Sequence, residues 1–188
     1  MATKKASRIP NPLALNMYVL GYDSKKKLTN VNQAVKENLQ TYLGQYRMVT
    51  DAINIKNAFV INIGVQFSIM TRPNFNKNEV LIRAIEEVKT FFDIDRWQIN
   101  QPIVLSDLVY RLSLVDGVAT VVPPVENNKQ SLPIVITNKY KSANGYSGNL
   151  YDIDAATKNG IIYPSLDPSI FELKYPGTDI EGRVVGDN

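Results

Sequence analysis

Strict alternation of apolar and polar side chains marks one stretch of the chain, residues 59–69. Every second position is apolar, and the positions between are mostly small or polar: Phe59, Ile61, Ile63, Val65, Phe67 and Ile69 alternate with Val60, Asn62, Gly64, Gln66 and Ser68. This period of two is typical of a β-strand with one buried face. At 3.3 Å per residue the strand would run roughly 36 Å. We therefore expect the rest of the fold to be organised around it.

Three further segments carry apolar residues at spacings of three and four, which predicts helices with one buried face. The first is capped by Thr29 or Asn30, the second by Asn76 or Asn78, and the third by Ser106. Their apolar positions are, in chain order, Val31, Ala34, Val35, Leu39, Tyr42 and Leu43; Val80, Leu81, Ala84, Ile85, Val88, Phe91 and Phe92; and Leu108, Val109, Leu112 and Val115.

Shorter apolar runs predict strands at residues 17–22, 118–122 and 133–137. Asn159-Gly160 is the signature of a two-residue hairpin, with strands expected at 151–153 and 161–163. Asp167-Pro168 is typical of a helix start, which predicts a helical turn over 169–173 before an extended tail. The order of these elements favours an α+β fold, an open sheet with helices packed on one face.

The pattern changes along the chain and indicates three regions. Residues 1–12 are polar and basic with two prolines, which predicts a leader or linker. Residues 13–124 hold the strand and helix patterns and are expected to form the α+β domain. Residues 125–188 lose helical periodicity and are rich in tyrosine, which predicts a β/loop-rich extension with an extended tail.

Composition removes several classes of chemistry. The 188 residues include no cysteine and no histidine, so disulfides, thiolate metal sites and Ser-His or Cys-His pairs are excluded. No apolar run has the length of a membrane span, and we expect no membrane contact. Residues 1–27 carry six basic side chains against one acidic, which leaves about −2 for the rest of a chain whose net charge is +3. The basic character therefore belongs to the amino-terminal end, and nucleic acid is not an expected partner of the body.

Three groups of residues leave alternatives open. Asp93-x-Asp95 and Asp152-x-Asp154 are either halves of a calcium or magnesium site or carboxylates at turns and helix ends. The lysines at 25–27, with those of the leader, either contact an anionic partner or form a solvated turn. The tyrosines after residue 125 indicate either a carbohydrate or peptide platform or, as we favour, contact with the body or a partner protein. No P-loop, dinucleotide fingerprint or nucleophile elbow is present, so we expect neither an enzyme nor a cofactor.

Several short motifs follow one another in a characteristic order. They are Tyr46-Arg47-Met48-Val49-Thr50-Asp51, Ile103-Val104-Leu105-Ser106-Asp107-Leu108, Val115-Asp116-Gly117-Val118, Ile162-Tyr163-Pro164-Ser165-Leu166-Asp167-Pro168 and Phe171-Glu172-Leu173-Lys174-Tyr175-Pro176. Their order resembles the carboxy-terminal part of the baseplate J-like family of contractile phage tails, and in particular its T-even-type baseplate wedge members. In that family a helix entered by a Ser-Asp pair and followed by a Gly-Val turn into a strand recurs at this place. The resemblance covers most of residues 13–188.

The resemblance implies a structural virion protein, a late protein assembled in the host cytoplasm into the tail baseplate. Members of the family form the inner ring around the tail tube, associating with their own copies, as dimers within the ring, and with other wedge proteins. They are much longer than this chain, which implies a carboxy-terminal fragment or a split version. The alternative from a different class is a stand-alone domain that binds nucleic acid or an anionic surface through the basic amino-terminal segment.

Two sets of side chains are the expected contact surfaces of such a protein. The first is the outward face of the long strand, and the second is the aromatic part of the extension. Alanine at Phe171 and Tyr175 is expected to weaken assembly while leaving the chain folded. The candidate residues are Asn62, Gln66 and Ser68 on the strand, and Tyr146, Tyr151, Tyr163, Phe171 and Tyr175 in the extension.

Overall fold

The computed structural model describes residues 15–46, 52–123 and 133–186. The chain divides into two compact units, Met1–Ala58 and Phe59–Asn188, here called unit 1 and unit 2. This division lies elsewhere than the change of sequence pattern at residue 124. Among the described residues, no helix combines the length and the hydropathy that crossing a bilayer requires.

Unit 1 is built on two parallel strands joined through a helix. β1 (Leu15–Val19) pairs with β4 (Ile53–Asn57). Between them lie a short hairpin, β2 (Gly21–Tyr22) with β3 (Leu28–Thr29), and the helix α1 (Gln33–Gly44). In the described part of unit 1, the buried hydrophobic side chains are Leu28 and Ala58.

Two predictions about α1 were wrong. Its cap is Asn32, whose side chain accepts a hydrogen bond from the Val35 N–H at 2.9 Å, because Thr29 belongs to β3 instead. The apolar stripe of α1 is also not buried. Val35 and Tyr42 are 50% and 56% exposed, and no residue of the helix is buried in unit 1.

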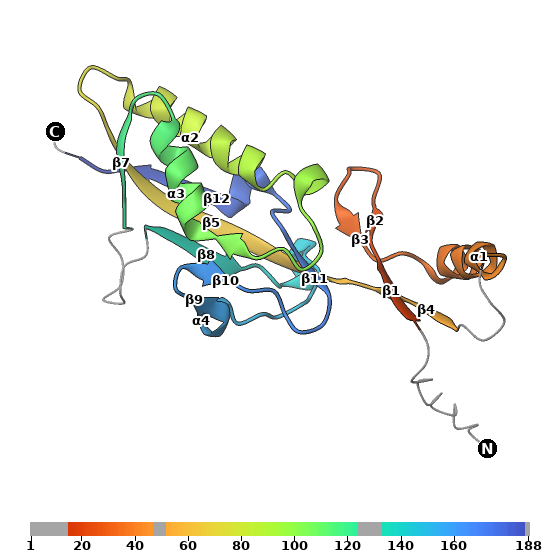
Figure 1. The fold of residues 1–188 in the computed structure, drawn as a ribbon. Coiled ribbons are helices and arrows are strands. Elements are labelled where there is room, and N and C mark those ends of the chain that lie inside the picture. Colours follow the sequence, from red (N-terminus) through yellow and green to blue (C-terminus); the bar gives the residue numbers. More distant parts are fainter. Residues whose placement is uncertain (1–14, 47–51, 124–132, 187–188) are drawn as a thin grey trace. The chain divides into compact units, whose positions relative to one another are not determined.

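Unit 2 is organised around β5 (Phe59–Thr71), which confirms the strand that the alternation predicts. Four shorter strands pair with it (Figure 1): β7 (Val118–Val122) and β8 (Ile134–Asn138) are antiparallel to β5, and β11 (Ser169–Glu172) and β12 (Ile180–Val184) are parallel. Three of the four come from beyond residue 124, so the region predicted as an extension contributes most of the partners of β5.

The parallel and antiparallel partners occupy opposite edges of β5. β7 and β8 share part of their register along β5 with β12, so they must lie on the other edge. Odd-numbered residues of β5 direct their backbone groups toward β11 and β12: the Phe59 N–H donates to Pro168 O at 2.9 Å, and the Val185 N–H donates to Ile69 O at 2.8 Å. Since backbone groups of alternate residues point to opposite edges, β11 shares the edge of β12.

The helices α2 (Lys77–Phe91) and α3 (Leu105–Leu114) lie over one face of the sheet built on β5 (Figure 1), which confirms the α+β fold. The odd-numbered side chains of β5 from Ile61 to Ile69 are buried. Gly182 of β12 shows how closely the layers pack, because a Cβ there would lie 2.7 Å from Phe67 Cζ and 2.8 Å from Leu81 Cδ1 of α2. Full burial of each apolar side chain contributes about 1.5–3 kcal/mol. The helical residues buried in this layer are Val80, Ala84, Val88, Leu105, Leu108 and Leu112.

The described part of unit 2 also holds a small second sheet and several short helices. The sheet joins β6 (Ile103–Val104), β10 (Ile161–Ile162) and β9 (Thr157–Lys158). Asn159 and Gly160 have φ values of 53° and 75°, as a hairpin turn with two left-handed residues requires, so the hairpin is confirmed. Its first strand lies later than expected, because part of the 151–156 segment is helical. The short helices are η1 (Ile94–Arg96), η2 (Ser142–Asn144), α4 (Ile153–Ala156) and α5 (Pro176–Asp179).

Local signals placed some boundaries correctly and others wrongly. Asn76 caps α2, which confirms the first of the two predicted caps, Asn76 and Asn78. Ser106 does not cap α3, because the helix begins directly after β6 and its first N–H, that of Leu105, donates to Gly160 O at 3.0 Å. The helical turn predicted over 169–173 was also wrong. That segment is β11, since pairing with the edge of β5 outweighs the local signal of Asp167-Pro168.

Candidate interaction surfaces

Asn62 is the centre of a buried polar cluster on the face of β5 opposite the helices. Its side chain donates to Glu172 Oε2 at 2.7 Å and accepts from the Ser147 N–H at 2.7 Å. Its carbonyl accepts from the side chain of Asn138 at 3.1 Å and from the Lys139 N–H at 2.8 Å. Residues 139–152, here called the covering loop, thus close over this face. Asn62 is completely buried as a result.

Tyr146 ties the covering loop to the last helix. Its hydroxyl donates to Asp179 Oδ1 at 2.5 Å, and the other carboxylate oxygen accepts from the Tyr175 N–H at 2.8 Å. Burial, reinforced by the negative charge of Asp179, raises the pKa of Tyr146 to about 12. The rings of Tyr146 and Tyr175 meet edge to face with centroids 5.4 Å apart. Gly145 has a φ of 83°, and a Cβ there would lie 2.5 Å from the Tyr175 hydroxyl, so only glycine fits.

The outward strand face predicted as a contact surface is therefore covered by the chain itself. The prediction of exposure was wrong for Asn62 and Ser68, which are 0% and 3% exposed. Gln66 is half-buried and donates to Glu181 Oε2 of β12 at 2.9 Å. At Asn62 this face is polar because the side chain bonds to Ser147 of the covering loop and to Glu172 of β11.

The predicted exposure of Phe171 was also wrong. Phe171 is 1% exposed, since β11 places it opposite Ile61 of β5 and its ring packs against that of Tyr151 at 6.0 Å. Tyr151 is itself half-buried, and its hydroxyl donates to Tyr163 O at 2.7 Å. Burial raises the pKa of Tyr151, with a smaller contribution from the charge of Asp152. These rings belong to the folded body.

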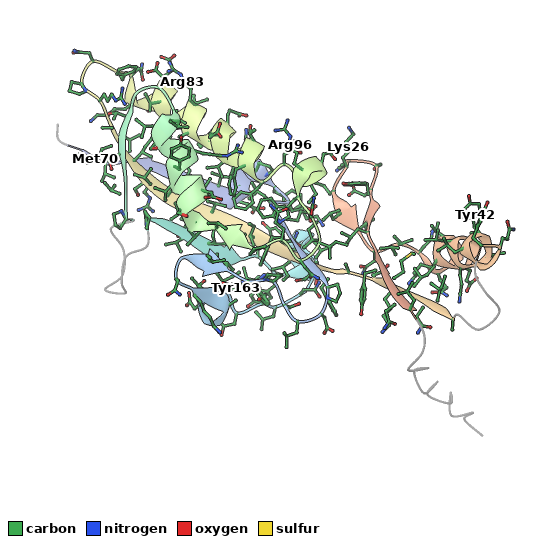
Figure 2. The ribbon with its side chains drawn as sticks, viewed as in Figure 1. Lys26, Tyr42, Met70, Arg83, Arg96 and Tyr163 are labelled. Atoms are coloured by element: carbon green, nitrogen blue, oxygen red, sulfur yellow. The ribbon has the colours of Figure 1, made fainter. Side chains whose placement is uncertain are left out.

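Tyr163 and Tyr175 keep exposed rings, at 46% and 38%. Tyr163 follows β10, and Figure 2 places it beside the small second sheet. Leu166, which sequence reasoning did not select, is fully exposed, and Phe59 is 46% exposed. The Phe59 N–H bonds to Pro168 O, so the backbone of β5 meets the segment that carries Leu166. Tyr163 and Leu166, the exposed large hydrophobic side chains of this segment, form what we call the 163–168 surface.

A signal for Leu166 was available in the sequence. An isolated leucine between Ser165 and Asp167, followed by proline, stands in a turn where side chains face water. The turn is held by its own hydrogen bonds: the Ser165 hydroxyl donates to Asp167 O at 2.6 Å, and its N–H donates to Ser169 Oγ at 3.1 Å. A leucine in a fixed turn loses little conformational freedom when a partner covers it.

The candidate metal-binding carboxylates cap helices. Asp93 accepts from the Asp95 N–H at 3.2 Å at the start of η1, and Asp152 accepts from the Ala155 N–H at 3.0 Å at the start of α4. In the part of the chain that the structure describes, no three acidic side chains come together as a metal site. Lys25 and Lys26 lie exposed in the turn between β2 and β3, where Asp23 accepts from the Lys25 N–H at 2.8 Å.

A scan of the sequence against protein-family models found no match, and a search among the curated proteins found none either. The likeness to the baseplate J-like family therefore stays a prediction. So do the predicted contact roles of Gln66, Tyr146, Tyr151, Tyr163 and Tyr175.

Proposed function

We propose that this chain is a structural module of a contractile phage tail baseplate, which works by binding its own copies and other wedge proteins. The proposal begins from the order of motifs between Tyr46 and Pro176, several of which belong to unit 2. The 163–168 surface is the observation that carries it furthest. It combines a fully exposed leucine with a half-exposed tyrosine ring on a segment fixed by hydrogen bonds.

This combination suits a protein contact better than contact with a small molecule. An aromatic ring and a leucine held in place supply apolar area at low entropic cost, which is what the centre of a protein interface uses. The segment also lies within one of the motifs that carry the resemblance, Ile162 to Pro168. The surface is thus proposed to contact a neighbouring wedge protein.

The experiment is a co-assembly assay. The purified chain is mixed with the other tail proteins encoded beside it, and the product is followed by analytical ultracentrifugation and electron microscopy. We expect a particle of defined mass. A double variant, Tyr163→Ser with Leu166→Ser, is expected to reduce co-assembly at least tenfold, because the apolar anchors of the contact are lost.

Ile82→Ser is the matched control, since Ile82 is 61% exposed on α2 and lies outside the 163–168 surface. It should co-assemble like the unchanged chain. Equal co-assembly by the double variant would reject this surface, and failure of the unchanged chain to join any tail protein would reject the proposed function.

The alternative function, binding of an anionic surface, is supported by the exposed lysines of the β2–β3 turn. It predicts retention on a phosphate column that falls steeply with salt. Lys25→Gln with Lys26→Gln should abolish that retention under this alternative, and should leave co-assembly unchanged under the proposed function.

A further inference from the structure

The described part of unit 1 is a small sheet with little buried apolar surface. Parallel strands are usually buried on both faces within larger sheets, and a two-stranded sheet rarely stands alone. Here β1 and β4 form such a pair, and among the described residues neither strand has a second partner. The buried hydrophobic side chains of the described part of unit 1 are only Leu28 and Ala58.

The two outer edges of this sheet differ. On β4, the outward carbonyl of Ile53 accepts a hydrogen bond from the side chain of Gln40 at 3.0 Å, and Lys56 adds a charge. β1 has the sequence Leu-Asn-Met-Tyr-Val, without charge or proline. Charges and prolines are the usual means by which sheet edges avoid pairing, so the edge of β1 is the unprotected one.

The hydrogen bonds to β4 show which backbone groups face that open edge. The Leu15 N–H donates to Ala52 O at 2.8 Å, and the Ala58 N–H donates to Val19 O at 3.1 Å. Odd-numbered residues of β1 are therefore turned toward β4. The N–H and C=O groups of Asn16 and Tyr18 point the other way, toward the open edge.

We propose that β1 pairs with β1 of a second copy, antiparallel about a twofold axis at Met17. In this register Asn16 lies opposite Tyr18 of the other copy, and each such pair exchanges two backbone hydrogen bonds. Leu15, which is 63% exposed, lies opposite Val19 of the other copy, so the apolar face continues across the junction. The result is a four-stranded sheet, β4-β1-β1-β4, with one α1 from each copy.

The charges favour a second copy as the occupant. The strand is uncharged, and its pattern is the same in both directions, with apolar side chains at 15, 17 and 19 and Asn16 and Tyr18 between them. When two copies pair edge to edge, their apolar side chains therefore lie on the same face of the joined sheet. The nearest basic side chains on the strands, the two Lys56, would be separated by three strand spacings of about 4.8 Å each. That separation exceeds the Debye length of about 8 Å at physiological ionic strength, so their repulsion is screened.

The inference deepens the proposed function, on which the biological meaning of the pairing rests, and its test is separate. The chain contains no cysteine, so Met17→Cys introduces the only thiol. In the proposed register, residue 17 of each copy lies opposite residue 17 of the other, in a non-hydrogen-bonded pair. The Cα atoms of such a pair are about 4.5 Å apart, which is within the range of a disulfide. Full-length Met17→Cys should form a covalent dimer under mild oxidation, and Tyr22→Cys on the exposed hairpin should not.

A pair of charge variants tests the register without relying on a cross-link. Asn16→Lys with Tyr18→Glu places opposite charges across the junction, whereas Asn16→Glu with Tyr18→Glu places like charges there. Both variants carry Glu at position 18, and they differ only in the sign of the charge at position 16, where Asn16 is exposed. By analytical ultracentrifugation of the chain alone, the first should remain dimeric, and the second should dissociate at least tenfold more readily.

A chain that sediments as a monomer at tens of micromolar, without a Met17→Cys dimer, would overturn the pairing. So would a dimer that responds equally to both charge variants. If the chain co-assembles with tail proteins as a monomer, the proposed function stands and this inference fails. If it dimerises through β1 but joins no tail protein, the inference stands and the proposed function fails.

Discussion

Unit 1 and unit 2 differ in how fully the described helices and loops of each unit cover its sheet. In unit 2 the apolar face of β5 is covered by α2 and α3, and its polar face is closed by the covering loop. In unit 1, α1 leaves Val35 and Tyr42 half-exposed, and β1 pairs with β4 alone among the described residues. The contrast shows that a helix beside a sheet does not by itself make a core. A core also requires enough strands for the helix to cover.

Native-state hydrogen exchange tests the difference between the two units most directly, because it measures the local stability of each. Amides of β5 should exchange only through global unfolding, whereas amides of α1 should exchange through local opening that costs several kcal/mol less. The physical reason is that no residue of α1 is buried in unit 1. Mass spectrometry of peptic fragments measures both regions in one experiment. Equal protection of the two would show that unit 1 has a core of its own.

Phe171→Ala tests how much of the stability of unit 2 depends on the strands that join late in the sequence. Phe171 is 1% exposed beside β5, so its truncation should lower the free energy of unfolding by about 3–5 kcal/mol. Urea denaturation followed by circular dichroism measures the change. Phe59→Ala is the control, because that ring is 46% exposed and should cost much less. Similar losses for the two variants would contradict the placement of β11.

Asn62→Ala probes the polar face of the same sheet. The substitution removes the acceptor of the Ser147 N–H and the donor to Glu172, and should cost about 1–3 kcal/mol because buried polar groups lose their bonds. Gln66→Ala on the same face should cost less, since Gln66 is only half-buried. If both variants lose the same stability, the covering loop does not depend on Asn62.

Replacement of Tyr146 is expected to have the smallest effect on stability, and this effect depends on pH. Its pKa in the folded chain is about 12, above the ordinary value of 10, so folding favours the neutral hydroxyl. That contribution is fully present below pH 10 and is lost as the pH rises through 12. Unfolding by urea between pH 9 and pH 12 should therefore show a decline in stability that is weaker in Tyr146→Phe. An identical decline in the variant would assign the effect to other groups.

The sequence was a good guide wherever the determining contacts are regular or local. The alternation from Phe59 to Ile69 located β5, and Asn159-Gly160 located a hairpin, because both signals lie within a few residues. Helix α2 was found from its periodicity and from Asn76.

The features that could not be predicted depend on distant residues. Asn62 looked like a surface side chain because its partners, Ser147 and Glu172, lie 85 and 110 residues away. The strand β11 looked helical because the Asp167-Pro168 signal is local, whereas its pairing with β5 is not. The predicted exposure of Asn62, Ser68 and Phe171 was wrong for the same reason. Polarity and aromaticity can be read from sequence, but exposure depends on what the chain folds over them.

The parallel arrangement of β5 and β12 has a mechanical consequence. A pull applied between Phe59 and Val184 draws the start of one strand and the end of the other in opposite directions along the same axis. Under that load the hydrogen bonds between the strands, from Val65 to Ile69, are sheared together and do not open one after another. A pull in this direction therefore meets the combined resistance of all these hydrogen bonds.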